Sequence, residues 1–225
     1  MVRQGENSFY VRKATCDEEV LRPRYGRSRF FAPGYRCRTH DIIVDVGAHI
    51  GAFAVAAARR VPHGRVYAVE PDKENFALLS RNAALNGLSN LIAHRIALSN
   101  RRGKAKLYYQ KENWAHSICP PMASDDSIGS DLVSTDTLSN FIATHAISRI
   151  DYMKMNVEGA EYKVLLQASK RSLQHIGFML VEFHPSVKHG ANQLVDRLRS
   201  CGFLTAVSRS KEEPGKGWLT ARFGY

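Results

Sequence analysis

The feature that most constrains the fold of this chain is a repeated alternation of short apolar runs with amphipathic segments. Residues 41–47 read DIIVDVG, an apolar run followed by a turn signal, which is typical of a strand buried on both faces. Further strand patterns occur at 65–70 and 90–99, with helical patterns at 52–60 and 71–87. Because repeated β-α units form parallel sheets covered by helices on both faces, the sequence predicts an α/β fold.

The second half of the chain continues this alternation. Residues 151–166 change from a strand into a helix, 176–185 are a buried strand and 191–202 an amphipathic helix. A closing strand pair is predicted at 203–209 and 217–225, an extra strand or hairpin at 103–110, and a short helix at 136–146. We expect one domain over residues 41–225, with a basic and aromatic N-terminal extension, 1–40, on the substrate side. Ligands of such sheets bind at the carboxyl ends of the strands.

Composition narrows the classes of protein. The four cysteines of this 225-residue chain form no C-x-x-C pair, which argues against a zinc site or a disulfide framework. No His/Asp cluster has ligand spacing, so we expect no metal. No apolar run approaches the roughly 20 residues of a membrane span, and the N-terminus does not resemble a signal peptide. The expectation is a cytoplasmic protein without a membrane span.

The formal net charge of +11 is unevenly distributed. Arginines alternate with aromatic residues and no acid occurs between Arg22 and Arg38, and a second basic cluster lies at 101–106. Such patches concentrate anions, so a phosphorylated small molecule, a nucleotide-linked substrate or RNA would fit. A basic solvated surface explains the same residues equally well.

The first chemical signal is VDVGAHIGAF, where the first strand leads into the first helix. The dehydrogenase pattern G-x-G-x-x-G is absent because His49 stands at its second glycine, which disfavours an NAD-dependent enzyme. The spacing from Asp45 through Gly47 to Gly51 is similar to that of Rossmann-like methyltransferases, which bind S-adenosylmethionine. Glu70, at the end of the second strand, suits the two hydroxyls of a ribose. The alternative is an ordinary α/β turn with Glu70 as a helix cap.

The second signal is the strand-to-helix junction in DYMKMNVEGAEYKVLL. Asn156 and Glu158 fall at the carboxyl end of the predicted fourth core strand, which we expect beside the first. Glu158 and Glu161 are three residues apart and can share a face. The structural alternative is equally good on these residues alone: Asn156 as a helix N-cap and the acids as first-turn residues that favour the helix dipole.

Over nearly the whole chain the sequence resembles the FkbM family of S-adenosylmethionine-dependent O-methyltransferases. The stretches that carry the resemblance are DVGAHIG, VYAVEPDKENFALLSRNAALNGLSN, IALSN, TDTLSNF, IDYMKMNVEGAEYKVLLQA and LVEFHP. Two residues depart from the usual pattern, Asn156 in place of Asp and His49 in place of Asn. The resemblance implies a Rossmann-like class I methyltransferase fold with a mostly parallel seven-stranded sheet. It also implies methyl transfer to a hydroxyl of a small molecule, sugar or natural-product scaffold, with S-adenosylhomocysteine as the product.

Positions at the strand ends, read together with this resemblance, give the candidate site residues. Those for the cofactor are Asp45, Gly47, Ala48, His49, Gly51, Glu70, Ala97 and Asn156. Those for catalysis are Asn156, which would orient the cofactor amine or the acceptor, and Glu158 or His184, which would act as general base. His184 also fits a structural role. His116 and Trp114 lie in a loop that could fold over the site.

Two alternative functions remain at this stage. One is an RNA methyltransferase that uses the basic surface, although the fourth strand ends in NVEG and no added RNA-binding module is visible. The other is a protein that binds S-adenosylmethionine without catalysis. Its only support is Asn156, which stands in place of the usual Asp.

Overall fold

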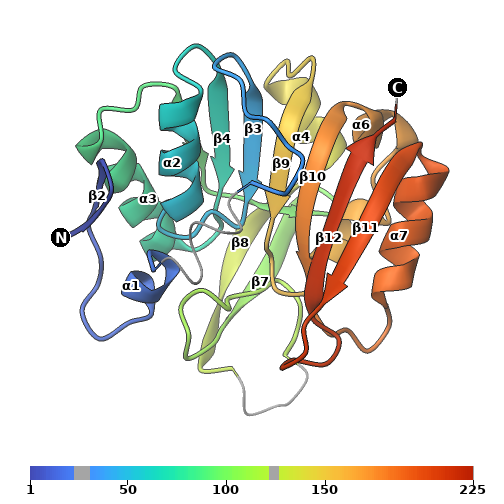
Figure 1. Cartoon of the computed structure of the whole chain (residues 1–225). Coiled ribbons are helices and arrows are strands. Elements are labelled where there is room, and N and C mark those ends of the chain that lie inside the picture. The colour runs from blue at the N-terminus through green and yellow to red at the C-terminus, as the bar shows by residue number, and fades with distance from the viewer. Residues whose placement is uncertain (23–30, 122–126, 225) are drawn as a thin grey trace.

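A mostly parallel sheet forms the centre of the computed structural model, which describes residues 1–22, 31–121 and 127–224. The sheet has seven strands in the order β11-β12-β10-β9-β3-β4-β5. Their bounds are β3 (Ile42–Val46), β4 (Arg65–Val69), β5 (Leu91–His94), β9 (Ile150–Met155), β10 (Ile176–Phe183), β11 (Phe203–Arg209) and β12 (Gly217–Phe223). Only β12 runs antiparallel to its neighbours β10 and β11 (Figure 1). The predicted sheet, the closing strand pair and the pairing of the fourth core strand, β9, with the first, β3, are confirmed.

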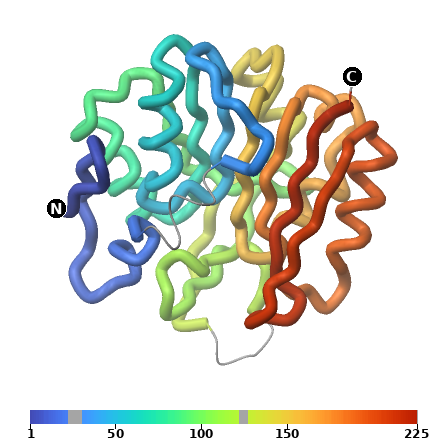
Figure 2. Tube along the Cα trace, viewed as in Figure 1, coloured from blue at the N-terminus to red at the C-terminus, as the bar shows by residue number. Residues whose placement is uncertain are grey.

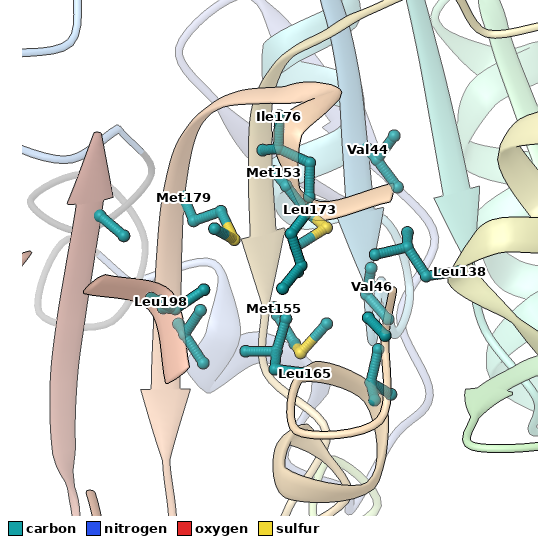
Figure 3. Packing of buried hydrophobic residues seen from close by; sticks show 14 of the residues in the cluster. Val44, Val46, Leu138, Met153, Met155, Leu165, Leu173, Ile176, Met179 and Leu198 are labelled. Carbon is teal, nitrogen blue, oxygen red and sulfur yellow. The ribbon is translucent and has the colours of Figure 1, made fainter. Parts of the chain in front are cut away.

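Helices cover both faces of the sheet (Figures 1 and 2). On one face lie α2 (Ala52–Arg60) and α3 (Lys73–Leu85), and on the other lie α4 (Leu138–Thr144), α5 (Glu161–Leu165), α6 (Lys170–Gln174) and α7 (Ala191–Ser200). The alternation of side chains along each strand divides the core. Val44, Met153 and Met179 pack under the second group of helices, as Figure 3 shows. Their neighbours Ile43 and Tyr152 pack on the other face.

A smaller sheet lies beyond the carboxyl ends of the central strands (Figure 1). It contains β6 (Ala97–Ser99), β8 (Gly129–Thr137) and β7 (Gly103–Tyr109), in that order. The predicted strand 90–99 is therefore two strands, because the chain turns after His94 and pairs with a different partner. No pattern in the sequence predicted β8, whose residues are mostly polar and exposed. The helix expected at 136–146 begins at Leu138, after the N-cap Thr137.

The N-terminal segment packs against α3. A short hairpin, β1 (Val2–Gln4) and β2 (Asn7–Phe9), precedes α1 (Asp17–Val20). The side chain of Asn86 accepts a hydrogen bond from the backbone amide of Ser8 and that of Asn82 from Tyr10. Farther along, Phe31 and Tyr35 pack against Tyr152 in the interior. Of the arginine-aromatic segment, residues 23–30 lie outside the described residues.

Gly47 is the position at which only glycine fits the turn after β3. Its φ is +80°, and a Cβ there would lie 1.8 Å from the backbone oxygen of Asn156. The missing side chain at Gly47 therefore allows the turn after β3 to approach the end of β9. Gly51 allows close packing of α2 on α3, since a Cβ there would lie 2.7 Å from Leu79 Cδ1 of α3.

Replacing Gly47 by Ala should therefore be far more destabilising than a left-handed backbone alone explains. Gly87→Ala is the matched control, because Gly87 has φ +65° and nothing within 4 Å of its Cβ position. We expect a loss of roughly 1 kcal/mol for Gly87→Ala from strain, and of more than roughly 3 kcal/mol for Gly47→Ala. Denaturant unfolding of both variants measures the difference, and equal losses would contradict the close approach.

Candidate active site

A cavity of about 840 Å³ opens at the carboxyl ends of β3, β4, β9 and β10. Strand periodicity places its polar side chains on one face of the sheet, the face covered by α2 and α3. Asp45 is paired in register with Lys154, and Glu182 with Trp218. These residues line the cavity together with Glu70, which directly follows β4. Roughly 300–1,000 Å³ is usual for a small-molecule site, so this cavity has the size to hold a nucleoside cofactor.

The Glu70 carboxylate lines the cavity and accepts two backbone hydrogen bonds. Its Oε2 accepts a hydrogen bond from the backbone amide of His49 (2.8 Å), and its Oε1 accepts one from Asp72 (3.0 Å). Burial raises the pKa of Glu70 to about 7, against the opposing effect of these two hydrogen bonds. Each carboxylate oxygen retains a second acceptor position, so the pair can receive both hydroxyls of a ribose.

Asp45 and Asn156 each have one buried side-chain oxygen that accepts no hydrogen bond from a described residue. Lys154 Nζ lies 3.4 Å from Asp45 Oδ1, while Asp45 Oδ2 and Asn156 Oδ1 have no hydrogen-bond partner among the described residues. Burial raises the pKa of Asp45, against the attraction of Lys154. Unpaired buried acceptors are costly, and both residues line the cavity. An amino group, such as that of the methionine part of S-adenosylmethionine, is the kind of donor that would satisfy them.

The remaining cofactor candidates differ in their access to the cavity. Gly47, Ala48, His49 and Ala97 all line it. Gly51 is absent from the lining residues and acts as the N-cap of α2, with φ 90°. Its contribution is therefore to the packing of α2 on α3. Backbone contact at Ala48 and His49 stays a prediction for the bound cofactor.

His184 lies between two carboxylates. Its Nε2 is 3.1 Å from Glu158 Oε2 and its Nδ1 is 3.4 Å from Glu161 Oε1. Burial alone would lower the pKa of His184, but Glu158 and Glu161 raise it to about 10. An imidazolium has no lone pair to accept a proton, and His184 does not line the cavity. The geometry therefore favours a role in holding Glu158 over the role of general base.

Glu161 holds the backbone on both sides of the contact between His184 and Glu158. It is fully buried, and its carboxylate accepts hydrogen bonds from the backbone amides of His184 (2.7 Å) and Gly159 (2.9 Å). Glu158 itself is in a left-handed conformation, with φ 50°, and Ser117 Oγ donates to its backbone oxygen (2.6 Å). Backbone strain of this kind is often found at functional sites.

The cavity is also lined by Glu182, Lys216 and Trp218, which were not among the site residues predicted from the sequence. Glu182 is 8% exposed, and Lys216 Nζ lies 3.7 Å from its Oε1. Burial raises the pKa of Glu182, more than the nearby cations lower it. The signal for Glu182 was present, because an acid interrupts the apolar strand MLVEF. Lys216 and Trp218 come from the β11–β12 hairpin, and no motif marks them.

Protonation of His184 gives a pH-dependent stability that can be measured. Its folded pKa of about 10 exceeds the ordinary 6.5, so its contribution is complete below 6.5 and is lost as the pH rises through 10. The free energy of unfolding should fall by up to about 1.4 kcal/mol per pH unit in this window relative to His184→Gln. Chemical denaturation across the window tests this. Parallel curves for the two proteins would show a neutral His184.

A parallel sheet whose first strand enters a helix through a glycine turn, with a carboxylate after the second strand and a cavity at both strand ends, is shared by Rossmann-like enzymes that bind nucleoside cofactors, the S-adenosylmethionine-dependent methyltransferases among them. The chain belongs to the FkbM methyltransferase family, since residues 45–205 match the methyltransferase FkbM domain. The cofactor is accordingly S-adenosylmethionine, and the unpaired acceptors at Asp45 and Asn156 fit its amino group.

Known proteins with similar sequences carry methyltransferase names. Methyltransferase sdnD of Sordaria araneosa is 28% identical over 215 residues, covering 82% of each chain. The 31-O-demethyl-FK506 methyltransferase FkbM of Streptomyces tacrolimicus is 25% identical over 235 residues, covering 92% of this chain and 86% of that protein.

Solved structures show the same fold at low sequence identity. An rRNA methylase from Streptococcus thermophilus has a TM-score of 0.53 at 11% identity, covering 84% of this chain and 90% of the other. Fibrillarin of Aeropyrum pernix, solved with natively bound S-adenosyl-L-methionine, has a TM-score of 0.50 at 13% identity, covering 85% and 70%. The likeness concerns the fold alone.

The described residues contain neither a metal-binding cluster nor a membrane-spanning helix. No group of three or more His, Cys, Asp or Glu residues in 1–22, 31–121 and 127–224 could hold a metal ion. Within the same ranges, no helix has the length and apolar character needed to span a membrane.

Removing the Glu70 carboxylate should weaken cofactor binding without unfolding the protein. We expect Glu70→Ala to bind S-adenosylhomocysteine at least about tenfold more weakly, because two hydroxyl hydrogen bonds to a charged acceptor are lost. Because ionised Glu70 is the better acceptor, wild-type affinity should also fall as the pH drops below 7, the value of its raised pKa. Calorimetry measures both effects, with NAD as competitor. Displacement by NAD, or unchanged affinity of the variant, would contradict this site.

Proposed function

We propose that this enzyme transfers a methyl group from S-adenosylmethionine to a hydroxyl of a small molecule, sugar or natural-product scaffold. The observation that carries the proposal is the pair of carboxylates, Glu158 and Glu182, that line the cavity together with Asn156. We call this part of the cavity the acceptor side, because the hydroxyl to be methylated would lie there. O-methylation requires loss of the hydroxyl proton, and a carboxylate in a partly dry site can receive it. The name of the FkbM relative, which refers to an O-demethyl substrate, supports the same chemistry.

Positioning is the main task of the chain in such a reaction. The sulfonium of S-adenosylmethionine supplies an electrophilic methyl group. Glu70 would hold the ribose, while Asp45 and Asn156 would hold the amino group, so that the methyl group faces the acceptor side. Asn156 suits this task although it lacks the charge of the usual Asp, because its unpaired Oδ1 can accept a hydrogen bond.

Glu158 and Glu182 are the candidates for the proton acceptor. Glu158 Oε2 lies 3.1 Å from His184 Nε2, so its carboxylate has a cationic neighbour. Glu182 has the ammonium group of Lys216 3.7 Å from its Oε1. Because its pKa is raised, Glu182 is a stronger base than an ordinary glutamate, which favours it for removing a hydroxyl proton.

The β11–β12 hairpin points to a polar acceptor. Arg209, Lys211, Glu213 and Lys216 line the cavity beside Trp218, so charged groups of both signs surround an aromatic surface. The cations suit an anionic or phosphorylated acceptor, and Trp218 could stack on a sugar or ring. RNA gains less support, because Phe31 and Tyr35 of the basic segment are partly buried and pack against Tyr152.

Methyl transfer from S-adenosylmethionine labelled in its methyl group is the direct test. Hydroxylated small molecules, glycosides and sugar phosphates form one panel, and total RNA forms a second. We expect label in hydroxylated small molecules, and kcat losses of roughly 10²–10⁴ for the variant that removes the base, Glu182→Gln or Glu158→Gln. His184→Gln should lose less, because its role is indirect.

The matched controls separate the alternatives. Both glutamine variants should bind S-adenosylhomocysteine like the wild type, since neither carboxylate is assigned to the cofactor. Label in RNA alone would replace the small-molecule acceptor, and cofactor binding without labelling of any acceptor would favour a non-catalytic binding protein.

A further inference from the structure

Asp17, which precedes the matched domain, forms the centre of a buried polar network that reaches into it. It is the first residue of α1 and is 0% exposed. Arg12 Nη2 donates to its Oδ1 (2.8 Å), and Arg12 Nε and the Arg12 backbone amide donate to its Oδ2 (3.0 and 2.8 Å). Burial alone would raise the pKa of Asp17, but these hydrogen bonds and that of Asn113 keep it lowered. Asp17 is therefore an ionised, tightly held anchor.

Asn113 connects this anchor to the glycine turn. Its Nδ2 donates to Asp17 Oδ1 and also lies 3.1 Å from His49 Nε2. An amide nitrogen has two hydrogens, so one can be donated to each partner. The backbone oxygen of Asn113 accepts from Asn75 Nδ2 of α3 (3.2 Å). The loop that carries Asn113, together with Trp114 beside it, is thereby tied to the N-terminal segment and to α3.

His49 is held as a neutral ring in a left-handed conformation. Burial lowers the pKa of His49 to about 3, despite the attraction of Asp17. Because Nε2 accepts from Asn113, the ring proton is assigned to Nδ1. The φ of His49 is 52°, which costs an ordinary residue roughly 1–2 kcal/mol. The side-chain contacts of His49 therefore help to hold a strained backbone.

That backbone leads directly to the cofactor site. The amide of His49 donates to Glu70 Oε2 at 2.8 Å, and both residues line the cavity with Asn113. A continuous path of contacts thus runs from Asp17 through Asn113 and His49 to Glu70. Its length is short, and every step is a polar contact between buried or nearly buried groups.

We propose that Asp17 and Asn113 are positioning residues of the cofactor site, holding the His49 ring and thereby the His49 amide that fixes the Glu70 carboxylate. The N-terminal segment is then a working part of the methyltransferase. This inference depends on the cofactor and not on the hydroxyl acceptor proposed above, so failure to find an acceptor would leave it standing.

Calorimetry with S-adenosylhomocysteine tests the proposal in the full-length protein. We expect Asp17→Asn and Asn113→Ala each to weaken binding about tenfold, because the chain of contacts to Glu70 is broken. Glu18→Gln is the matched control, since it removes an exposed acid from the same helix and should change affinity by less than about twofold. Wild-type affinity for Asp17→Asn and Asn113→Ala would overturn the proposal.

A double-mutant cycle distinguishes positioning from general destabilisation. His49→Asn removes the ring, and Asn tolerates the left-handed backbone. In this background Asn113→Ala should weaken binding by less than about twofold, because its route to Glu70 is already gone. Equal effects of Asn113→Ala with and without the His49 ring would show that Asn113 does not act through His49, and would overturn the proposal. If Asp17→Asn fails to fold, the cycle between Asn113 and His49 still decides.

Discussion

The close approach of two strand ends governs the geometry of this site. Gly47 lets the turn after β3 meet the backbone of Asn156, so close that a Cβ would overlap its oxygen. The amide of Asn156 donates to the carbonyl oxygen of Val46 at 2.9 Å, which extends the pairing of β3 with β9 into the turn. Asn156 is therefore fixed beside the first strand, and Glu158 follows it at the edge of the cavity. The positions of Asn156 and Glu158 relative to the turn after β3 depend on this contact.

Charge pairs then hold the groups that this framework brings together. Asp45 pairs with Lys154, Glu182 with Lys216, and His184 with Glu158 and Glu161. Burying such groups is costly, and each pair offsets the cost only while both partners stay in place. The same pairs shift the pKa of several groups, as burial does for Glu70 and Glu182. The same buried charge pairs therefore set both the positions of these side chains and their pKa values.

The folding of the chain around the cavity explains why residues outside the matched domain matter. The family match begins at residue 45, yet Val20 lines the cavity and Asp17 contacts residues of its wall. The C-terminal hairpin closes the opposite side with Lys216 and Trp218, beyond the match's end at residue 205. Segments from both ends of the chain therefore complete a site whose centre is the conventional parallel sheet.

Local patterns in the sequence were sufficient for the framework of the fold. Apolar runs and helix signals predicted the central strands, and the motifs around Gly47, Glu70 and Asn156 placed the cofactor side at the carboxyl ends of the sheet. These features depend on neighbours in the sequence, such as strand periodicity and turn chemistry. The same patterns missed β8, whose polar residues carry no strand signal, and the division of residues 90–99 between two sheets.

The tertiary structure alone decided which polar groups meet. Asp17 and Asn113 are 96 residues apart, and their contact with each other and with His49 has no signature in either stretch. His184 was a candidate base from its position, but two carboxylates that fold around it make it a cation. Lys216 reaches Glu182 only because β12 runs antiparallel beside β10. Sequence alone therefore determined where strands end and helices begin, because those signals are local. Burial and long-range contact determined the charge and role of each side chain, because they arise only when distant segments pack together.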